Sequence, residues 1–202
     1  MSPRLRRRLS VWGIPLALAL AFAAGAVSCA TRDDDRAPTG GATRLTEPED
    51  ALSEDLMVAL AQAKNFHHKA KVYMSDGNLD EAVASVRQIL AIQFPLGAPE
   101  AEDVRLDARA LLAKLLVGQG KVEEAKRVVD EGIASASRDS FFLANLYTVR
   151  GEVFEATAAL ADDGSPDGKT RAADARKAAI AAYDKSISIN EQLQKRLVER
   201  RP

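Results

Sequence analysis

The sequence predicts an all-α fold built from six helices arranged as antiparallel pairs. Ala, Leu, Lys, Glu and Arg, which are strong helix formers, dominate the chain from residue 49 onward. The alternation of apolar and polar residues that marks a half-buried strand is absent there, and almost all of the eight prolines fall outside the periodic segments. With 47 % hydrophobic and 28 % charged residues, the chain has the composition of a soluble protein that can bury a core.

The first 28 residues have the layout of a bacterial secretory signal. Four arginines within residues 4–8 precede an apolar stretch over 11–27, and small residues then lead to Cys29, the only cysteine of the chain. The apolar stretch is shorter than the roughly 20 residues of a typical transmembrane helix, and two glycines and a proline interrupt it. We therefore expect a signal peptide at 1–28.

The cysteine gives this signal a more specific meaning. The run Gly25-Ala26-Val27-Ser28-Cys29 resembles the lipobox of bacterial lipoproteins, with Ala26 at the position where leucine is commonest. The resemblance implies cleavage before Cys29, a diacylglyceryl thioether on its sulfur, and attachment to a membrane of the bacterial cell envelope. Because Ala30 is not the aspartate that retains enteric lipoproteins at the inner membrane, we expect the outer membrane, facing the periplasm. A plain signal peptide and an uncleaved anchor are the alternatives.

Residues 29–48 predict a lipidated, flexible linker ahead of a helical domain at 49–200. The segment contains almost no large apolar side chains, so it cannot bury enough surface to offset the entropy of ordering. Asp33-Asp34-Asp35 lacks the glycine turn of a metal-binding loop, and we interpret it as solvated charge. Loss of the signal and its four arginines changes the net charge from −1 to −5, which leaves no general basic surface for nucleic acid.

Six periodic segments predict the helices of the domain. We place them at 49–74, 79–92, 100–117, 121–136, 139–161 and 169–198. The breaks between them are rich in turn-forming glycine, proline, asparagine and aspartate, and the last break is the run 162–168. Short connections of this kind join antiparallel neighbours.

An internal repeat relates the helix pairs. The segment GNLDEAV at 77–83 recurs as GKVEEAK at 120–126, and a related piece lies at 179–190. These segments resemble the second helices of tetratricopeptide repeats. The first helices match the large, small and aromatic positions in part, through Phe66, Ala70 and Tyr73, then Ala113 and Leu116, then Tyr147, Gly151 and Phe154. The resemblance implies a tetratricopeptide-like stack of about three degenerate repeats.

The spacing of these repeats differs from that of a regular array. The small residue of the second helix recurs after 43 residues, from Ala82 to Ala125, and after 54 residues, from Ala125 to Ala179, against about 34 in the family. A longer connection at 94–99 accounts for the first excess. The second lies inside repeat three, where alanine-rich segments flank 162–168 and predict a helical hairpin about two turns longer than normal. A disordered insertion is the alternative.

The chain offers few groups for catalysis, and we expect no enzyme, no cofactor and no metal site. His67 and His68 are adjacent, so on a helix they point about 100° apart and cannot bind one metal together. Catalytic and phosphate-binding motifs are absent, and the only thiol is assigned to lipid. Aromatic residues recur at helical spacing and are expected to be mostly core, namely Phe66, Tyr73, Phe141, Phe142, Tyr147, Phe154 and Tyr183.

Stacked helix pairs form a groove in which the tetratricopeptide family holds extended peptides or partner helices. From the repeat alignment, the expected groove residues are Lys64, His67, Lys71, Met74, Ala110, Lys114, Asn145, Thr148 and Glu152. The lysines with Asn145 resemble the Lys/Asn arrangement that clamps a peptide's terminal carboxylate in some members of the family. Exposed lysines are also ordinary solubility residues, and this alternative stays open.

These patterns together predict a lipid-anchored envelope scaffold that binds a protein or peptide. Within that class, an assembly factor of the secretion, pilus or outer-membrane type is the main hypothesis. One alternative is a structural lipoprotein that self-associates through its long last helix. Another is an adaptor of a polysaccharide-export or cell-wall complex.

Overall fold

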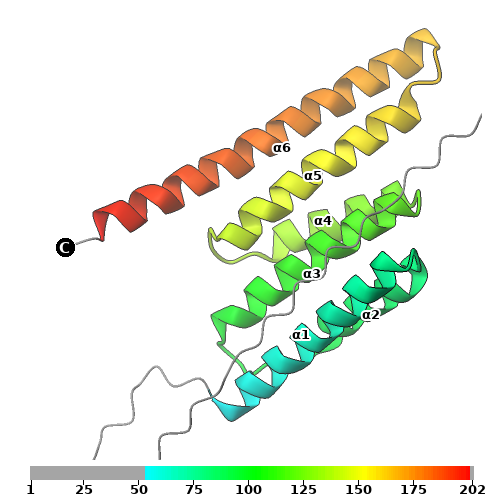
Figure 1. Ribbon diagram of the computed structural model, residues 1–202. Coiled ribbons are helices and arrows are strands. Elements are labelled where there is room, and N and C mark those ends of the chain that lie inside the picture. Colours follow the sequence, from blue (N-terminus) through cyan, green and yellow to red (C-terminus); the bar gives the residue numbers. More distant parts are fainter. Residues whose placement is uncertain (1–52, 201–202) are drawn as a thin grey trace, which may run out of the picture. The chain divides into compact units, whose positions relative to one another are not determined.

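Six α-helices make up the part of the chain that the computed structural model describes, residues 53–200 (Figure 1). They are α1 (Glu54–Ser75), α2 (Leu79–Ala91), α3 (Pro99–Gly118), α4 (Val122–Ser135), α5 (Phe141–Ala161) and α6 (Pro166–Glu199). Consecutive helices pack as the pairs α1–α2, α3–α4 and α5–α6. In addition, α2 packs on α3, and both α3 and α4 pack on α5, so each pair stacks on the next. The predicted all-α, tetratricopeptide-like stack of antiparallel helix pairs is confirmed.

Serine caps and glycine turns set several helix ends. Ser53 precedes α1 in an extended conformation, and its hydroxyl oxygen accepts a hydrogen bond from the backbone N–H of Leu56 at 3.2 Å. The helix α1 therefore starts at Glu54, and the predicted start at 49 lies outside the described residues. Gly77 and Gly120 follow α1 and α3 with φ of 72° and 74°, a left-handed conformation that glycine adopts without steric cost.

Small residues mark the places where paired helices approach most closely. The aligned small positions of the first and second helices are all buried, and they are Ala70, Ala82, Ala113, Ala125, Gly151 and Ala179. At Gly151 a β-carbon would lie 2.6 Å from the ring atom Cζ of Tyr183 on α6, so only glycine fits without a shift. The repeat alignment made from the sequence therefore identifies the packing positions of all three pairs.

The third pair is a long, ordered hairpin. In the first two pairs the first helix ends five residues after its small position, whereas α5 continues ten residues beyond Gly151. The last helix begins at Pro166, three residues before the predicted start, because Ser165 caps it by accepting a hydrogen bond from the Gly168 N–H at 2.9 Å. The predicted extension is confirmed, and residues 162–165 form its connecting turn.

The core follows the stack, with Leu106, Leu116, Leu146 and Ile189 among its fully buried side chains. The aromatic residues are mostly half-buried against this core. Phe141 is an exception with an exposed fraction of 65 %, so the expectation that it is core was wrong. Phe142 instead turns inward from the first turn of α5, and its ring meets that of Phe141 edge-to-face at 5.6 Å.

The predicted signal peptide, Cys29 and the linker at 29–48 lie outside the described residues. Within residues 53–200, none of the helices combines the length and the apolar character needed to cross a membrane.

Candidate functional site

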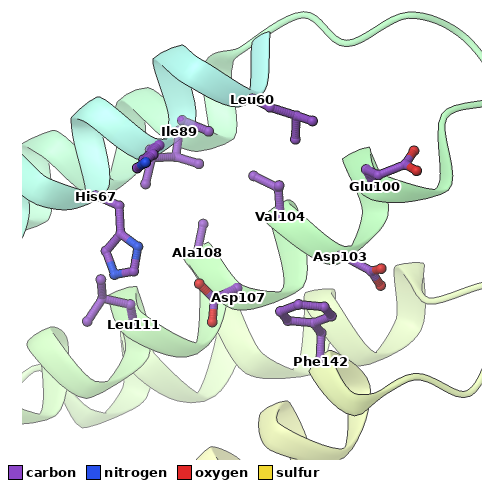
Figure 2. Close-up of a pocket in the computed structure, with 12 residues that line it drawn as sticks. Leu60, His67, Ile89, Glu100, Asp103, Val104, Asp107, Ala108, Leu111 and Phe142 are labelled. Carbon is purple, nitrogen blue, oxygen red and sulfur yellow. The ribbon is translucent and has the colours of Figure 1, made fainter. Parts of the chain in front are cut away.

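An apolar pocket of about 370 Å³ is lined by residues of α1 and α3, by Ile89 of α2 and by Phe142 at the start of α5 (Figure 2). We call it the α1–α3 pocket. Its floor consists of the buried Ala63, Ile89 and Ala108, and its walls are the half-buried Leu60, Val104, Leu111 and Phe142. Two of the floor residues are alanines, whose short side chains leave space between α1 and α3. The pocket is therefore an open apolar surface held by rigid helices.

Charged residues surround this apolar surface unequally. Of the predicted groove residues, the pocket brings together Lys64 and His67, both from α1. From the other side, α3 contributes the carboxylates of Glu100, Asp103 and Asp107. Because these three acids face one lysine and one histidine, the lining has more negative than positive charge. None of the three acids was predicted from the sequence.

A helical row would have identified these acids. Asp107, Leu111 and Lys114 are spaced four and three residues apart and so lie on one face of α3. Extension of this row toward the start of the helix reaches Glu100 and Asp103. The residue assigned instead, Ala110, is 2 % exposed and belongs to the core, so its assignment to the groove was wrong.

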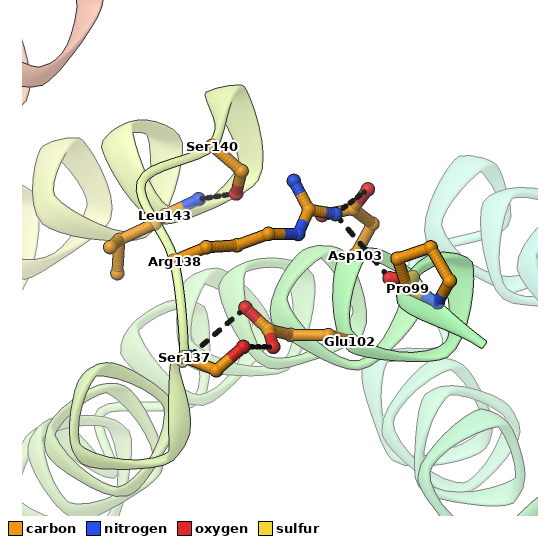
Figure 3. A network of polar contacts seen from close by, with 7 residues as sticks. All are labelled: Pro99, Glu102, Asp103, Ser137, Arg138, Ser140 and Leu143. Atoms are coloured by element: carbon orange, nitrogen blue, oxygen red, sulfur yellow. Dashed lines mark hydrogen bonds and ion pairs between the residues drawn. The ribbon is translucent and has the colours of Figure 1, made fainter. Parts of the chain in front are cut away.

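Asp103 belongs to a polar network that fastens the α4–α5 connection to the start of α3 (Figure 3). An Arg138 Nη2 donates to Asp103 Oδ2 at 2.7 Å and to the Pro99 carbonyl at 3.4 Å. Next to it, the Ser137 hydroxyl and backbone N–H both donate to the Glu102 carboxylate. The remaining oxygen of Asp103, Oδ1, is buried and has no hydrogen-bond partner within the described residues.

Two more predicted groove residues meet between α3 and α5. Lys114 Nζ lies 3.0 Å from Glu152 Oε1, beside a smaller apolar pocket of about 160 Å³ lined also by Val149. Their side chains are 47 % and 40 % exposed, so this is a surface ion pair. Because Glu152 already neutralises Lys114, this lysine carries less free positive charge than a carboxylate clamp requires.

The other predicted residues lie apart from these two pairs. Lys71 is exposed on α1, one turn beyond His67 on the same face. Asn145 is half-buried on α5 and shares a face with Phe142 and Val149. The Thr148 hydroxyl lies 2.9 Å from that of Ser186, so it faces α6.

A second pocket of about 620 Å³ continues the α1–α3 pocket toward the end of α6. We call it the α5–α6 pocket. It shares Asp103 and Phe142 with the α1–α3 pocket, which makes the two surfaces contiguous. Its other lining residues are Arg138, Asp139, Ser140, Phe141, Asn190, Leu193, Gln194, Arg196, Leu197 and Arg200. Its three arginines lie near two aspartates, and Arg138 and Arg196 pair with Asp103 and Asp139. The lining of this pocket is therefore close to neutral, in contrast to the acidic side of the α1–α3 pocket.

Metal ligation and acid–base chemistry have little support in this part of the chain. Across residues 53–200, no group of three or more His, Cys, Asp or Glu side chains is placed to hold a metal ion. The pKa of Tyr183 is raised, first by burial and then by the nearby Glu155 carboxylate. This phenol packs against Gly151 at the α5–α6 contact and lines neither the α1–α3 pocket nor the α5–α6 pocket.

Comparison with known proteins identifies one segment. Residues 63–94 match the family model of the tetratricopeptide repeat. The matched segment covers the second half of α1, all of α2 and the start of the following connection, and it includes His67 and Lys71. No curated protein and no solved structure matches the chain. Tetratricopeptide repeats are typically non-catalytic modules that bind other proteins. The chain therefore carries a tetratricopeptide repeat at residues 63–94 within an all-α stack of helix pairs, which indicates a scaffold for protein–protein interaction.

Proposed function

We propose that the chain is a lipid-anchored scaffold of the bacterial cell envelope that binds a polypeptide segment of another envelope component. The observation that carries the binding role is the open apolar α1–α3 pocket. A concave apolar surface with a few polar groups at its edge is the usual form of a binding site. The lipid anchor and the envelope location rest on the lipobox-like run that ends at Cys29.

The presence of two adjacent pockets favours a polypeptide over a small molecule. The α1–α3 pocket, at about 370 Å³, is near the lower end of the roughly 300–1,000 Å³ typical of ligand sites. It adjoins the α5–α6 pocket of about 620 Å³, with which it shares the lining residues Asp103 and Phe142. A polypeptide segment that spans both pockets would contact residues of α1, α3, α5 and α6.

The experiment is photo-crosslinking in native membranes with the full-length chain. A Leu60→Glu and Leu111→Glu double variant places charge on two half-buried walls of the α1–α3 pocket. We expect it to lose the crosslinked partner while its circular dichroism keeps the helical signal. The matched control, Ile180→Glu with Ile187→Glu, changes two exposed apolar residues of α6 and should keep the partner. Retention of the partner by the Leu60/Leu111 variant would contradict the proposal.

Self-association through α6 is the second candidate function, and one observation favours it. Ile180 and Ile187 are 61 % and 54 % exposed and lie seven residues apart, so they share a face of the helix. Light scattering of the full-length chain in detergent separates the two functions. If α6 forms a homotypic contact, the wild-type chain is a dimer and the Ile180→Glu/Ile187→Glu variant is a monomer.

A further inference from the structure

We infer that the partner segment inserts an apolar side chain into the α1–α3 pocket and places a basic side chain against Glu100 and Asp107. This inference rests on the proposed function and adds the chemistry of the bound segment. It differs from the carboxylate-binding clamp that the lysines suggested, because the charge that faces the pocket from α3 is negative.

The apolar half of the inference follows from the composition of the pocket. Its floor side chains are 5 % exposed or less, at Ala63, Ile89 and Ala108. Water over such a floor has no polar partner there, so an apolar side chain gains free energy by replacing it. Leu60 and Leu111 on opposite walls would contact the inserted group from two helices.

The expectation of a basic side chain in the partner segment follows from which carboxylates of the pocket already have an ion-pair partner and which do not. Asp103 is paired with Arg138 at 2.7 Å. By contrast, Glu100 and Asp107 make no ion pair within residues 53–200, although both are half-buried at the pocket. Lys64, the lysine of the lining, is exposed on α1. An incoming lysine or arginine would therefore complement two unpaired negative charges, whereas an acidic residue would be repelled.

The test uses four fluorescein-labelled 12-residue peptides and the purified full-length chain, with binding measured by fluorescence anisotropy. Three peptides share a central phenylalanine and differ in its two flanking residues, which are lysine, glutamine or glutamate. The fourth has flanking lysines and serine in place of phenylalanine. Two charge contacts with the half-buried Glu100 and Asp107, each of the strength of an ordinary surface ion pair, predict about tenfold tighter binding of the lysine peptide than of the glutamine peptide. Loss of the phenylalanine should weaken binding at least tenfold.

Charge-reversed variants locate the effect. Glu100→Lys with Asp107→Lys should reverse the preference, so that the glutamate peptide binds more tightly than the lysine peptide. The matched control, Glu123→Lys with Asp174→Lys, makes the same change of charge at exposed positions of α4 and α6 outside the pocket. It should keep the lysine preference at low salt, and 1 M salt should reduce the preference in the wild-type chain because exposed charges are screened.

Three results would overturn the inference. The first is equal binding, or no binding, of the three phenylalanine peptides. The second is an unchanged lysine preference in the Glu100/Asp107 variant. The third is tenfold tighter peptide binding after Arg44→Glu with Leu45→Glu, two changes in the linker at 29–48. Such a gain would mean that this basic–apolar pair of the chain itself competes with the peptide for the pocket, so the occupant would not be a partner segment.

The outcomes also separate this inference from the proposed function. If the Leu60/Leu111 variant loses its native partner but the peptides prefer glutamate, the scaffold function stands and the inference fails. If that variant keeps its native partner while the wild-type chain selects the lysine peptide, the chemistry of the pocket stands and the proposed function fails.

Discussion

Replacement of Gly151 by alanine tests how closely α5 and α6 must approach. A β-carbon at this position would lie 2.6 Å from Cζ and 2.8 Å from Cδ1 of Tyr183. Ordinary carbon–carbon contacts are about 3.5–4.0 Å, so the ring or the helix has to move by about 1 Å. Overpacking of this kind typically costs about 1–3 kcal/mol. Alanine regains up to about 1 kcal/mol because it is the better helix former, and the net loss of stability is about 1 kcal/mol.

A double-mutant cycle separates the two contributions. In a Tyr183→Ala background the steric conflict is absent, so Gly151→Ala should now raise the free energy of unfolding by up to about 1 kcal/mol. The coupling energy between the two positions should then be about 2 kcal/mol. Urea unfolding of the full-length chain, followed by far-ultraviolet circular dichroism, measures all four corners of the cycle.

Gly118→Ala provides the matched control. Gly118 is the last residue of α3, and a β-carbon there meets only Leu79 Cδ1, at the ordinary contact distance of 3.6 Å. This change should therefore be neutral or slightly stabilising. If Gly151→Ala behaved like Gly118→Ala in the wild-type background, close approach at Gly151 would not constrain the α5–α6 packing and the reasoning would be wrong.

Three further predictions concern pH, capping and anchoring. Burial and Glu155 raise the pKa of Tyr183 above its unfolded value near 10, so the free energy of unfolding should fall as pH rises above 10. Urea unfolding repeated across this pH range should show a less steep fall in the Tyr183→Phe variant. Ser140→Ala removes a buried N-cap whose hydroxyl oxygen accepts a hydrogen bond from the Leu143 N–H at 3.1 Å, and it should lower the free energy of unfolding by about 1–2 kcal/mol in the same assay. If Ser140→Ala cost less stability than Ser53→Ala, which removes an exposed N-cap, burial would not strengthen the cap. Cys29→Ser should move the protein from the membrane fraction to the soluble fraction without loss of helical signal, and continued behaviour as an integral membrane protein would refute the lipid anchor.

Local signals explain why the helices and their pairing could be predicted. Gly77 and Gly120 each follow a helix and begin the similar segments 77–83 and 120–126, so sequence similarity alone aligned two repeats. The small positions followed from the same alignment. The start of α6 was placed late because 162–168 is rich in turn-forming residues, although Ser165 and Pro166 together form a helix start.

Pairing between distant residues explains why the chemistry of the groove could not be predicted. Lys114 and Glu152 are separated by 38 residues, and their 3.0 Å contact depends on how α3 crosses α5. The sequence assigned both to the groove, but it carried no signal that one would neutralise the other. Arg138 and Asp103 pair across 35 residues in the same way.

These pairings decide which charges remain for a ligand. Lys114 is neutralised by Glu152 and Asp103 by Arg138, so neither charge is free to bind a ligand. Glu100 and Asp107, by contrast, make no ion pair within residues 53–200. An exposed ion pair contributes only about 0–1 kcal/mol to stability, so the Lys114–Glu152 pair is not needed to hold the stack together. The larger consequence of the two pairings is selectivity, because they leave the negative charge of Glu100 and Asp107 beside the apolar α1–α3 pocket. For this reason, detection of a bound segment does not by itself distinguish this groove from a carboxylate clamp. The distinction requires a measurement of whether the groove prefers a basic or an acidic segment.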